Sequence, residues 1–372
     1  MYLEQLELSN FRNYKKITLK LSPYINIFYG DNAQGKTNLL EAIYFLGLSK
    51  SQRTSDNSSL IRSENNTANV KGILNINDET INMFIGFDNE KKVLKINEQL
   101  VSKVKDYNAY MNIIYFGPDD LDLIKGNPEV RRKYLNTQIS QMSISYSKLL
   151  DEYNRLLKMR NDYLSNAVYN FDGSYFKILT SYLIERSISI YKYRKNYIDK
   201  INKLVPSIFY SITNFSDFSI KYVPNIDIDY NSNTIKQNLM DLYESKLDEE
   251  KAVGKTLIGP HRDDFEYYLE NNNLKLYGSQ GQQRLSVITL KLAEISVFQD
   301  IKGSTPIILL DDVFSELDDK KKNSLLKFIN KTAQVIITTT ELTNIDKKIL
   351  KNAHIMKICN GNLEEVKEHG TK

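Results

Sequence analysis

Gly30-Asp31-Asn32-Ala33-Gln34-Gly35-Lys36-Thr37 is the stretch that decides the fold. It fits the pattern G-x-x-x-x-G-K-[ST], which is typical of a loop that cradles nucleotide phosphates. Residues 25–29 before it are apolar and rich in β-forming side chains, and residues 38–46 after it have helical spacing. Glycines let backbone N–H groups converge on phosphates, and a helix N-terminus adds partial positive charge. The sequence therefore predicts a nucleotide-binding loop between a strand and a helix.

Individual residues of this loop (residues 30–37, the phosphate loop) have separate expected roles. Lys36 is expected to reach the β- and γ-phosphates, and the Thr37 hydroxyl is expected to hold Mg²⁺. The other residues expected to contact the nucleotide are Gly30, Asp31, Asn32, Ala33, Gln34 and Gly35. A chance glycine–lysine turn is the alternative interpretation, and the flanking strand and helix patterns weigh against it.

Bulk composition limits the classes of function. The chain has 372 residues, enough for one large domain or several ordinary ones, and its net charge of +4 is only mildly basic. Such a balance is compatible with nucleic-acid binding without arguing for it. A single cysteine, Cys359, excludes an intramolecular disulfide and a cysteine-based metal site. No apolar run reaches the length of a membrane span, and no signal-peptide pattern starts the chain, so we expect a cytoplasmic protein with no membrane partner.

The pattern of expected secondary structure changes twice along the chain. Short β-type segments dominate the first 120 residues, helical spacing dominates residues 127–205, and alternating β and α patterns return after residue 256. A β-rich nucleotide-binding domain split by a helical insertion is therefore expected. Basic residues recur along the second long helical pattern, at Arg186, Lys192, Arg194, Lys195, Lys200 and Lys203. They fit a solvated helix face best, and a stripe facing nucleic acid is the alternative.

Two aspartates that follow a buried strand pattern complete the predicted site. Residues 306–310 form a continuous apolar run of the buried parallel type, and Asp311 and Asp312 follow it directly. A carboxylate at the carboxyl end of such a strand lies beside the phosphate loop in proteins of this kind. We expect Asp311 to hold Mg²⁺ and Asp312 to orient or deprotonate the attacking water. The alternative is that two aspartates merely end a strand and begin a turn.

A polar loop at residues 277–284 precedes another long helical pattern. It contains Ser279, Gln280 and Gly281. A polar, glycine-bearing loop that opens a helix is a second anion-binding device. Since one chain usually needs only one phosphate loop, this suggests a nucleotide held between two copies of the chain. A simple helix N-cap is the alternative.

Together these residues resemble the ATP-binding-cassette ATPases of the SMC/Rad50/RecF type, and the RecF family in particular, over nearly the whole chain. The segments that carry the resemblance are residues 10–14, 30–40, 50–54, 116–121, 125–132, 259–264, 278–284 and 311–318. Gln52 and Asn136 depart from the residues expected in close relatives, and Pro118 stands where Rad50-type heads carry the glutamine of the Q-loop. Thr338-Thr339-Thr340 stands where transporter cassettes have a switch histidine.

The resemblance implies the fold and its division. It implies an α/β fold, a P-loop ABC-type ATPase head of mixed sheets and helices interrupted by a helical second lobe. Residues 1–126 and 251–372 are expected to form the head, and residues 127–250 to form the inserted lobe. The interval between Arg132 and Gly254 is too short for the long coiled coils of SMC and Rad50 proteins, and it shows no sustained heptads.

Roles for single residues also follow from the resemblance. Ser279, Gln280 and Gly281 match the signature loop, which contacts the γ-phosphate of a partner copy. Lys36 and Asp312 are the implied catalytic residues, and Arg12 joins the residues implied to contact ATP. Thr37 and Asp311 are the implied Mg²⁺ ligands. Residues 315–318 resemble the D-loop at the dimer interface.

The implied activity is that of an ATP-dependent DNA-binding switch. Two ATP molecules would join two heads into a homodimer that binds DNA at gaps and junctions without sequence preference, and weak, DNA-stimulated ATP hydrolysis would release it. With RecO and RecR as partners, such a protein promotes RecA loading and SOS induction. The alternatives are the nucleotide-binding subunit of a membrane transporter and an interaction protein with a vestigial ATP site.

Overall fold

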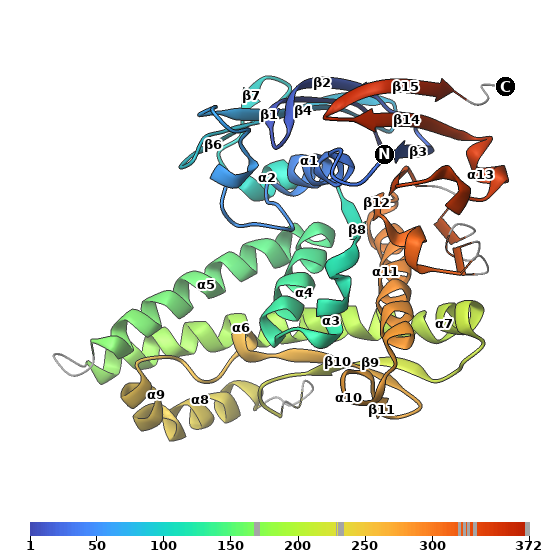
Figure 1. Cartoon of the computed structure of the whole chain (residues 1–372). Helices are drawn as coiled ribbons and strands as arrows, with labels where there is room; N and C mark the ends of the chain where they lie inside the picture. Colours follow the sequence, from blue (N-terminus) through green and yellow to red (C-terminus); the bar gives the residue numbers. More distant parts are fainter. Residues whose placement is uncertain are drawn as a thin grey trace. The chain divides into compact units, whose positions relative to one another are not determined.

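The structure is a computed structural model that describes residues 1–166, 172–227, 229, 234–318, 321–322, 325, 328–329 and 333–368. The chain forms two compact units (Figure 1). The first unit comprises residues 1–120, 211–214 and 288–372, and the second comprises residues 121–210 and 215–287. The second unit thus extends beyond the predicted end of the inserted lobe at residue 250. The predicted head and lobe boundaries remain a prediction.

An antiparallel sheet of six strands makes up one layer of the first unit, in the order β2-β1-β4-β5-β6-β7. Its strands are β1 (Tyr2–Phe11), β2 (Tyr14–Lys20), β4 (Ala68–Ile76), β5 (Glu79–Phe87), β6 (Lys92–Ile96) and β7 (Gln99–Leu100). Burial alternates along β4 and β5, as expected for strands with one face in the core and one face toward solvent.

A second sheet of six strands carries the predicted site, in the order β15-β14-β3-β13-β12-β8. Its strands are β3 (Ile25–Tyr29), β8 (Ile113–Phe116), β12 (Ile307–Asp311), β13 (Val335–Thr339), β14 (Ala353–Cys359) and β15 (Asn362–Glu368). Only β15 pairs in antiparallel fashion among these strands. Every residue of β12 and β13 is buried, which explains why residues 306–310 read as a continuous apolar run.

Helix α1 (Lys36–Leu48) follows the phosphate loop and packs against strands of both sheets. Leu39, Leu40, Phe45 and Leu46 are fully buried and belong to the same hydrophobic core as residues of both sheets. Because the helix is covered nearly all round, its sequence shows little amphipathic pattern. This packing fixes the helix that carries the end of the phosphate loop.

Short elements complete the first unit. They are η1 (Ser58–Leu60), α2 (Val104–Asn108), η4 (Val313–Glu316), η5 (Leu342–Asn344) and α13 (Lys347–Leu350). Residue ranges of both units contribute to η2 (Pro118–Leu121), to α7 (Val205–Thr213) and to α11 (Gln280–Lys302).

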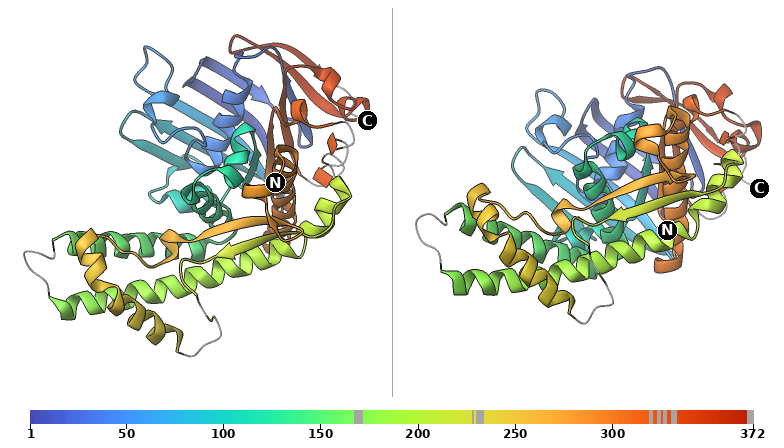
Figure 2. Two further views of the ribbon diagram at one scale, coloured as in Figure 1. Left: turned by 60° about the horizontal axis from the view of Figure 1, so that its bottom comes forward. Right: turned by 90° about the horizontal axis from the view of Figure 1, so that it is seen from below.

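The second unit is built around two long helices, α5 (Ile144–Ser165) and α6 (Gly173–Asn202), which lie side by side in each view (Figure 2). A three-stranded antiparallel sheet accompanies them, in the order β11-β10-β9. The remaining elements are α3 (Asp122–Lys125), α4 (Pro128–Met142), β9 (Phe218–Val223), α8 (Ile235–Ser245), α9 (Leu247–Val253), η3 (Pro260–Arg262), β10 (Asp264–Leu269), β11 (Asn272–Asn273) and α10 (Leu274–Tyr277).

Most of the predicted elements are confirmed, with two differences in the second unit. Strand β9 lies inside the stretch 127–250, where only helices were expected, and it pairs with β10 from outside that stretch. Arg194 is buried against Asp263, so the prediction of a solvated face for this residue of α6 was wrong. Among the described residues, no helix is long and apolar enough to cross a membrane.

Candidate nucleotide-binding site

The phosphate loop has the backbone that a phosphate cradle requires. Gly30 and Gly35 adopt φ values of 146° and 109°, and Ala33 has φ 63°. A Cβ at Gly30 would lie 2.3 Å from the carbonyl oxygen of Ile358 in β14, so only glycine fits there. Asp31, Asn32 and Ala33 are exposed, which leaves the outer part of the loop open to a ligand.

Hydrogen bonds from the β1–β2 connection and from the β14–β15 connection hold the phosphate loop in place. The Tyr14 hydroxyl donates to the Gly35 carbonyl at 3.0 Å, and the Asn13 amide donates to the Gln34 carbonyl at 3.2 Å. From the other side, the backbone N–H of Asn360 donates to the Gln34 side chain at 2.6 Å. Because these hydrogen bonds hold the conformation of the loop without a bound phosphate, the loop is preorganised for binding.

Lys36 lies inside the loop that it is predicted to serve. Its ammonium donates to the carbonyl oxygens of Gly30 and Asp31, at 2.6 Å each. Burial lowers the pKa of Lys36, and the carboxylates of Asp312, Asp31 and Asp311 oppose that shift. The ammonium is thus surrounded by oxygen acceptors, an environment in which a phosphate oxygen is a suitable replacement partner.

Thr37 and Asp311 come together although 274 positions separate them in sequence. The Thr37 hydroxyl donates to Oδ1 of Asp311 at 2.9 Å, and the Thr338 hydroxyl donates to the same oxygen at 2.7 Å. Tyr115 donates its hydroxyl to Oδ2 at 2.9 Å. The parallel pairing of β12 with both β13 and β8 brings these side chains to one edge of the sheet.

Magnesium chemistry fits this pair of side chains. A threonine hydroxyl and a carboxylate are hard oxygen ligands, and Mg²⁺ commonly takes one or two such ligands together with phosphate oxygens and water. Asp312 follows directly, with φ 53°, and its backbone N–H donates to the Thr338 hydroxyl at 3.1 Å. The predicted roles of Asp311 and Asp312 are compatible with this geometry, and they remain predictions.

Arg12 makes bonds that the sequence did not reveal. It forms a two-point salt bridge with Glu41 of α1, with Nε–Oε2 and Nη2–Oε1 distances of 2.9 and 2.7 Å, and its Nη1 donates to the Ser59 carbonyl. The Glu41 side chain is 0 % exposed and also accepts a bond from Ser51. Arg12 therefore neutralises a buried carboxylate, and the predicted contact with ATP remains untested.

The signature loop lies in the second unit and opens helix α11. Ser279, Gln280 and Gly281 are all exposed. Ser279 Oγ accepts from the Gln282 N–H at 3.3 Å, while Gln282 Oε1 accepts from the Ser279 N–H at 2.8 Å. This reciprocal pair is a capping box, so these residues cap helix α11, and the expected contact with a phosphate of a partner copy stays a prediction. A Cβ at Gly281 would meet nothing within 4 Å.

Several other predicted features can now be placed. Pro118 begins η2 and supplies no side-chain ligand. Asn136 accepts hydrogen bonds from Arg194 and from the Tyr146 hydroxyl, at 2.9 and 2.7 Å, as a carboxylate would. The side chains of Ser315 and Glu316, in the predicted D-loop, lie outside the described residues. Cys359 is a free thiol.

Sequence reasoning missed two tyrosines of the site. Tyr14 braces the phosphate loop, and Tyr115 contacts Asp311. Tyr14 stands within the quoted segment 10–14, so its position was known but its contact was not. Tyr115 stands in an apolar run that reads simply as a buried strand, and no sequence signal distinguishes it.

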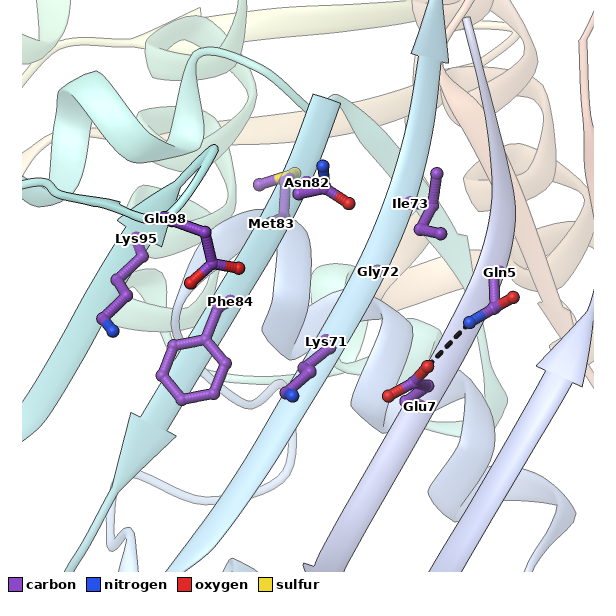
Figure 3. A pocket seen from close by; sticks show the side chains of 10 residues that line it. All are labelled: Gln5, Glu7, Lys71, Gly72, Ile73, Asn82, Met83, Phe84, Lys95 and Glu98. Carbon is purple, nitrogen blue, oxygen red and sulfur yellow. Dashed lines mark hydrogen bonds between the residues drawn. The ribbon is translucent and has the colours of Figure 1, made fainter. Parts of the chain in front are cut away.

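A separate hollow of about 280 Å³ lies on the solvent-facing side of the antiparallel sheet (Figure 3). Register places Glu7, Lys71, Phe84 and Lys95 opposite one another on β1, β4, β5 and β6. Both lysines lie over the Phe84 ring, at 5.8 and 5.6 Å from its centroid. Such cross-strand pairs stabilise a sheet, and they explain this row without a ligand.

Comparisons with known proteins agree with this arrangement. The family model described as the RecF/RecN/SMC N-terminal domain matches residues 2–361. A curated relative, the DNA replication and repair protein RecF of Staphylococcus aureus (strain JH9), is 36 % identical over 368 residues, which cover 98 % of this chain and 100 % of the relative.

Solved structures give the same result. The recombination mediator protein RecF of the RecFOR pathway, solved with ATP, has a TM-score of 0.90 and 31 % identity over 99 % of this chain and 98 % of its own. Its form solved as RecF-ATPrS has a TM-score of 0.88 and 31 % identity over 98 % of this chain and 97 % of its own. The predicted α/β ATPase head fold is confirmed, and the chain belongs to the RecF family, which shares the RecF/RecN/SMC N-terminal domain.

Proposed function

We propose that this chain is an ATP-dependent DNA-binding protein of replication and recombinational repair. The observation that carries the proposal is the 2.9 Å bond between Thr37 of the phosphate loop and Asp311 at the end of β12. It joins the two halves of an ATP site across the sheet. The RecF relatives, one named for DNA replication and repair and another solved with ATP, support the same assignment.

Residues of the first unit supply the chemistry of ATP binding and hydrolysis. Backbone N–H groups of residues 30–37 and the Lys36 ammonium hold the phosphates, and Thr37 and Asp311 hold Mg²⁺, which neutralises phosphate charge when bound. Asp312 orients the attacking water and accepts its proton. A weak ATPase, stimulated by DNA, is the expected activity.

The signature loop completes the site of a second copy. Its exposure and its position at the start of the 23-residue helix α11 suit it to a phosphate that another chain presents. ATP would then join two chains into a homodimer, with each nucleotide held by residues 30–37 of one copy and residues 279–281 of the other. Hydrolysis would separate the copies.

Dimerisation is the step that we propose to control DNA binding. The dimer would bind DNA through phosphate contacts, without sequence preference, at single-strand gaps and junctions. RecO and RecR are the proposed partners, RecA loading and SOS induction are the proposed outcomes, and the cytoplasm is the proposed location. The similar solved protein is a recombination mediator of the RecFOR pathway, which supports these partners. We also propose that residues 1–126 and 251–372 act as the head and residues 127–250 as the second lobe.

Lys36→Arg tests the proposal. The longer, planar guanidinium cannot take the place of an ammonium that fits between two carbonyls at 2.6 Å, so ATP-dependent dimerisation and DNA retention should be lost. Light scattering measures the dimer, and a gel shift with gapped duplex measures DNA retention. Lys16→Arg, at an exposed position of β2, is the matched control and should behave as the parent. A Lys36→Arg protein that dimerises and retains DNA with ATP like the parent would contradict the proposal.

A further inference from the structure

The Asp311 carboxylate accepts a hydrogen bond from the hydroxyl of Tyr115, a residue of β8 that lies outside the phosphate loop. Two hydroxyls, of Thr37 and Thr338, donate to Oδ1, and within the described part of the chain only the Tyr115 hydroxyl, at 2.9 Å, donates to Oδ2. A carboxylate turns easily about its last torsion, since that torsion is broad. A donor on the second oxygen therefore acts together with the two donors on the first to fix the direction in which the carboxylate faces.

Strand register explains how Tyr115 reaches this carboxylate. Tyr115 of β8 lies opposite Leu309 of β12 in the parallel ladder, and Asp311 comes two residues later on β12. Side chains at positions i and i+2 of a strand share a face, so Tyr115 and Asp311 project from the same side of the sheet. The length of the tyrosine ring spans the remaining offset.

The ring of Tyr115 is held on two sides. It makes a T-shaped contact with Tyr44 of α1, with ring centroids 6.0 Å apart and an interplanar angle of 71°. A Cβ at Gly117 would lie 2.4 Å from both Cε1 and Oη of Tyr115, so Gly117 provides the space in which the ring lies. Gln52 is a further polar neighbour of the hydroxyl.

The backbone of Tyr115 is fixed as well. The buried Lys291 ammonium donates to the Tyr115 carbonyl at 2.5 Å and forms an ion pair with Asp120. Asp120 in turn accepts from the Gly117 N–H at 2.8 Å. The residues named here as setting the position, the ring plane and the hydroxyl direction of Tyr115 all belong to the first unit.

We propose that Tyr115 is a positioning residue that aims Oδ1 of Asp311 at Thr37 and so tunes the affinity of the ATP site for Mg²⁺. The inference rests on the proposed ATP site. It assigns no contact between Tyr115 and the nucleotide. Hydrogen-bonding partners of a ligating carboxylate commonly change metal affinity when they are removed.

Tyr115→Phe is the direct test, because it keeps the ring, the Tyr44 contact and the space over Gly117 and removes one oxygen. The Mg²⁺ concentration that gives half-maximal binding of a fluorescent ADP analogue should rise about ten-fold. Binding of the analogue in EDTA should match the parent. Gly117→Ala, which displaces the ring, should shift the Mg²⁺ requirement in the same direction.

Tyr107→Phe is the matched control. Its hydroxyl is buried and has no hydrogen-bond partner among the described residues, so the same atom is removed without a lost bond. The Mg²⁺ requirement of this variant should equal that of the parent. Thermal unfolding without nucleotide shows whether each variant is folded.

Two results would overturn the inference. One is a Tyr115→Phe protein with the Mg²⁺ requirement of the parent, and the other is equal weakening of nucleotide binding with Mg²⁺ and with EDTA. Either of these leaves the proposed function intact. A parent protein that fails to bind the analogue under both conditions would instead contradict the ATP site itself, and this inference with it.

Discussion

At the scale of single residues, the buried carboxylate of Glu41 determines what Arg12 does. Glu41 is 0 % exposed and receives two bonds from Arg12, whereas Arg53 approaches it at 3.6 Å from a side chain that is 43 % exposed. Removing one partner of a buried ion pair leaves an uncompensated charge. Arg12 therefore has a structural task, whatever its contact with ATP.

We predict that Arg12→Ala lowers the free energy of unfolding by about 3 kcal/mol. Arg53→Ala loses a longer and more exposed contact with the same carboxylate and should cost less than about 1 kcal/mol. Denaturant unfolding of the protein without nucleotide measures both. Equal losses of unfolding free energy in the two variants would contradict a larger stabilising contribution from the Arg12 salt bridge than from Arg53.

His261 makes stability depend on pH. Its Nε2 lies 3.1 Å from the Thr256 carbonyl and its Nδ1 lies 2.6 Å from the Tyr153 hydroxyl, an arrangement that suits a neutral ring. Burial lowers the pKa of His261 from 6.5 to about 4, with nearby arginines adding to the shift. The unfolded chain therefore binds a proton at a higher pH than the folded chain does.

We predict that this contribution is complete above pH 6.5 and is lost as the pH falls toward 4. The full loss is at most about 3.5 kcal/mol, because one pKa unit corresponds to about 1.4 kcal/mol. His261→Gln cannot titrate and should show a flatter profile over this range. Urea unfolding at a series of pH values measures the free energy of unfolding of the parent and of His261→Gln. If both change with pH in the same way, His261 is not the source of the pH dependence.

The residue scale also shows what the sequence could not supply. The phosphate loop and Asp311 were predicted because a few neighbouring residues in the sequence are enough to recognise each of them. Tyr115 and the Glu41 partner of Arg12 were not, because their contacts arise only when strands and helices far apart in sequence pack together. Nothing in a run of apolar residues shows which one will reach a carboxylate.

At the scale of elements, helix α6 is tied into the second unit by a buried arginine. The Arg194 guanidinium donates to Asp263 and to the Pro260 carbonyl, at 2.7 and 2.6 Å, and also contacts Asn136 of α4. Asp263 also accepts a bond from the Tyr222 hydroxyl of β9. Since Arg194 Nε also donates to the Tyr146 hydroxyl of α5, this side chain connects three helices with a short 3₁₀ turn, and Asp263 extends the connection to the small sheet.

We predict that Arg194→Met lowers the free energy of unfolding by about 3 to 5 kcal/mol, since Asp263 would remain buried without its cation. Lys195→Met removes the adjacent positive charge, whose pair with Asp199 has side chains 44 % and 49 % exposed, and should change stability by under about 1 kcal/mol. Thermal or denaturant unfolding measures both. A similar effect of the two substitutions would contradict the network.

Elements were predicted well where one pattern dominates. The buried run of β12 and the helical spacing within residues 127–205 were recognised because burial on both faces of a strand or on one face of a helix leaves a regular pattern of apolar residues. Burial of Arg194 was missed, because a basic residue on a long helix usually faces solvent. The pairing of β9 with β10 was missed because helices α8 and α9 separate the two strands in sequence.

At the scale of the whole molecule, two compact units carry different parts of the proposed ATP site. The phosphate loop, Asp311 and Asp312 belong to the first unit, and the signature loop belongs to the second. A full-length match to RecF proteins gives no support to the alternative of a transporter subunit. ATP turnover measured with DNA present tests the alternative of a vestigial ATP site.

The proposed dimer predicts that two defective variants repair each other. Lys36→Arg damages the phosphate loop, and Gly281→Arg fills the open space beside the signature loop without a clash in the single chain. A dimer of one copy of each contains one site in which both loops are intact. Gln299→Arg, an exposed position near the other end of α11, places the same side chain on the same helix as a control.

The central measurement is therefore the DNA-stimulated ATP turnover of an equimolar mixture of Lys36→Arg and Gly281→Arg, compared with each variant alone. Our account predicts that each variant alone is inactive and that the mixture regains turnover, together with particles of twice the 43.2 kDa of the single chain. A mixture as inactive as its components, while Gln299→Arg is active, would contradict a site shared between two copies.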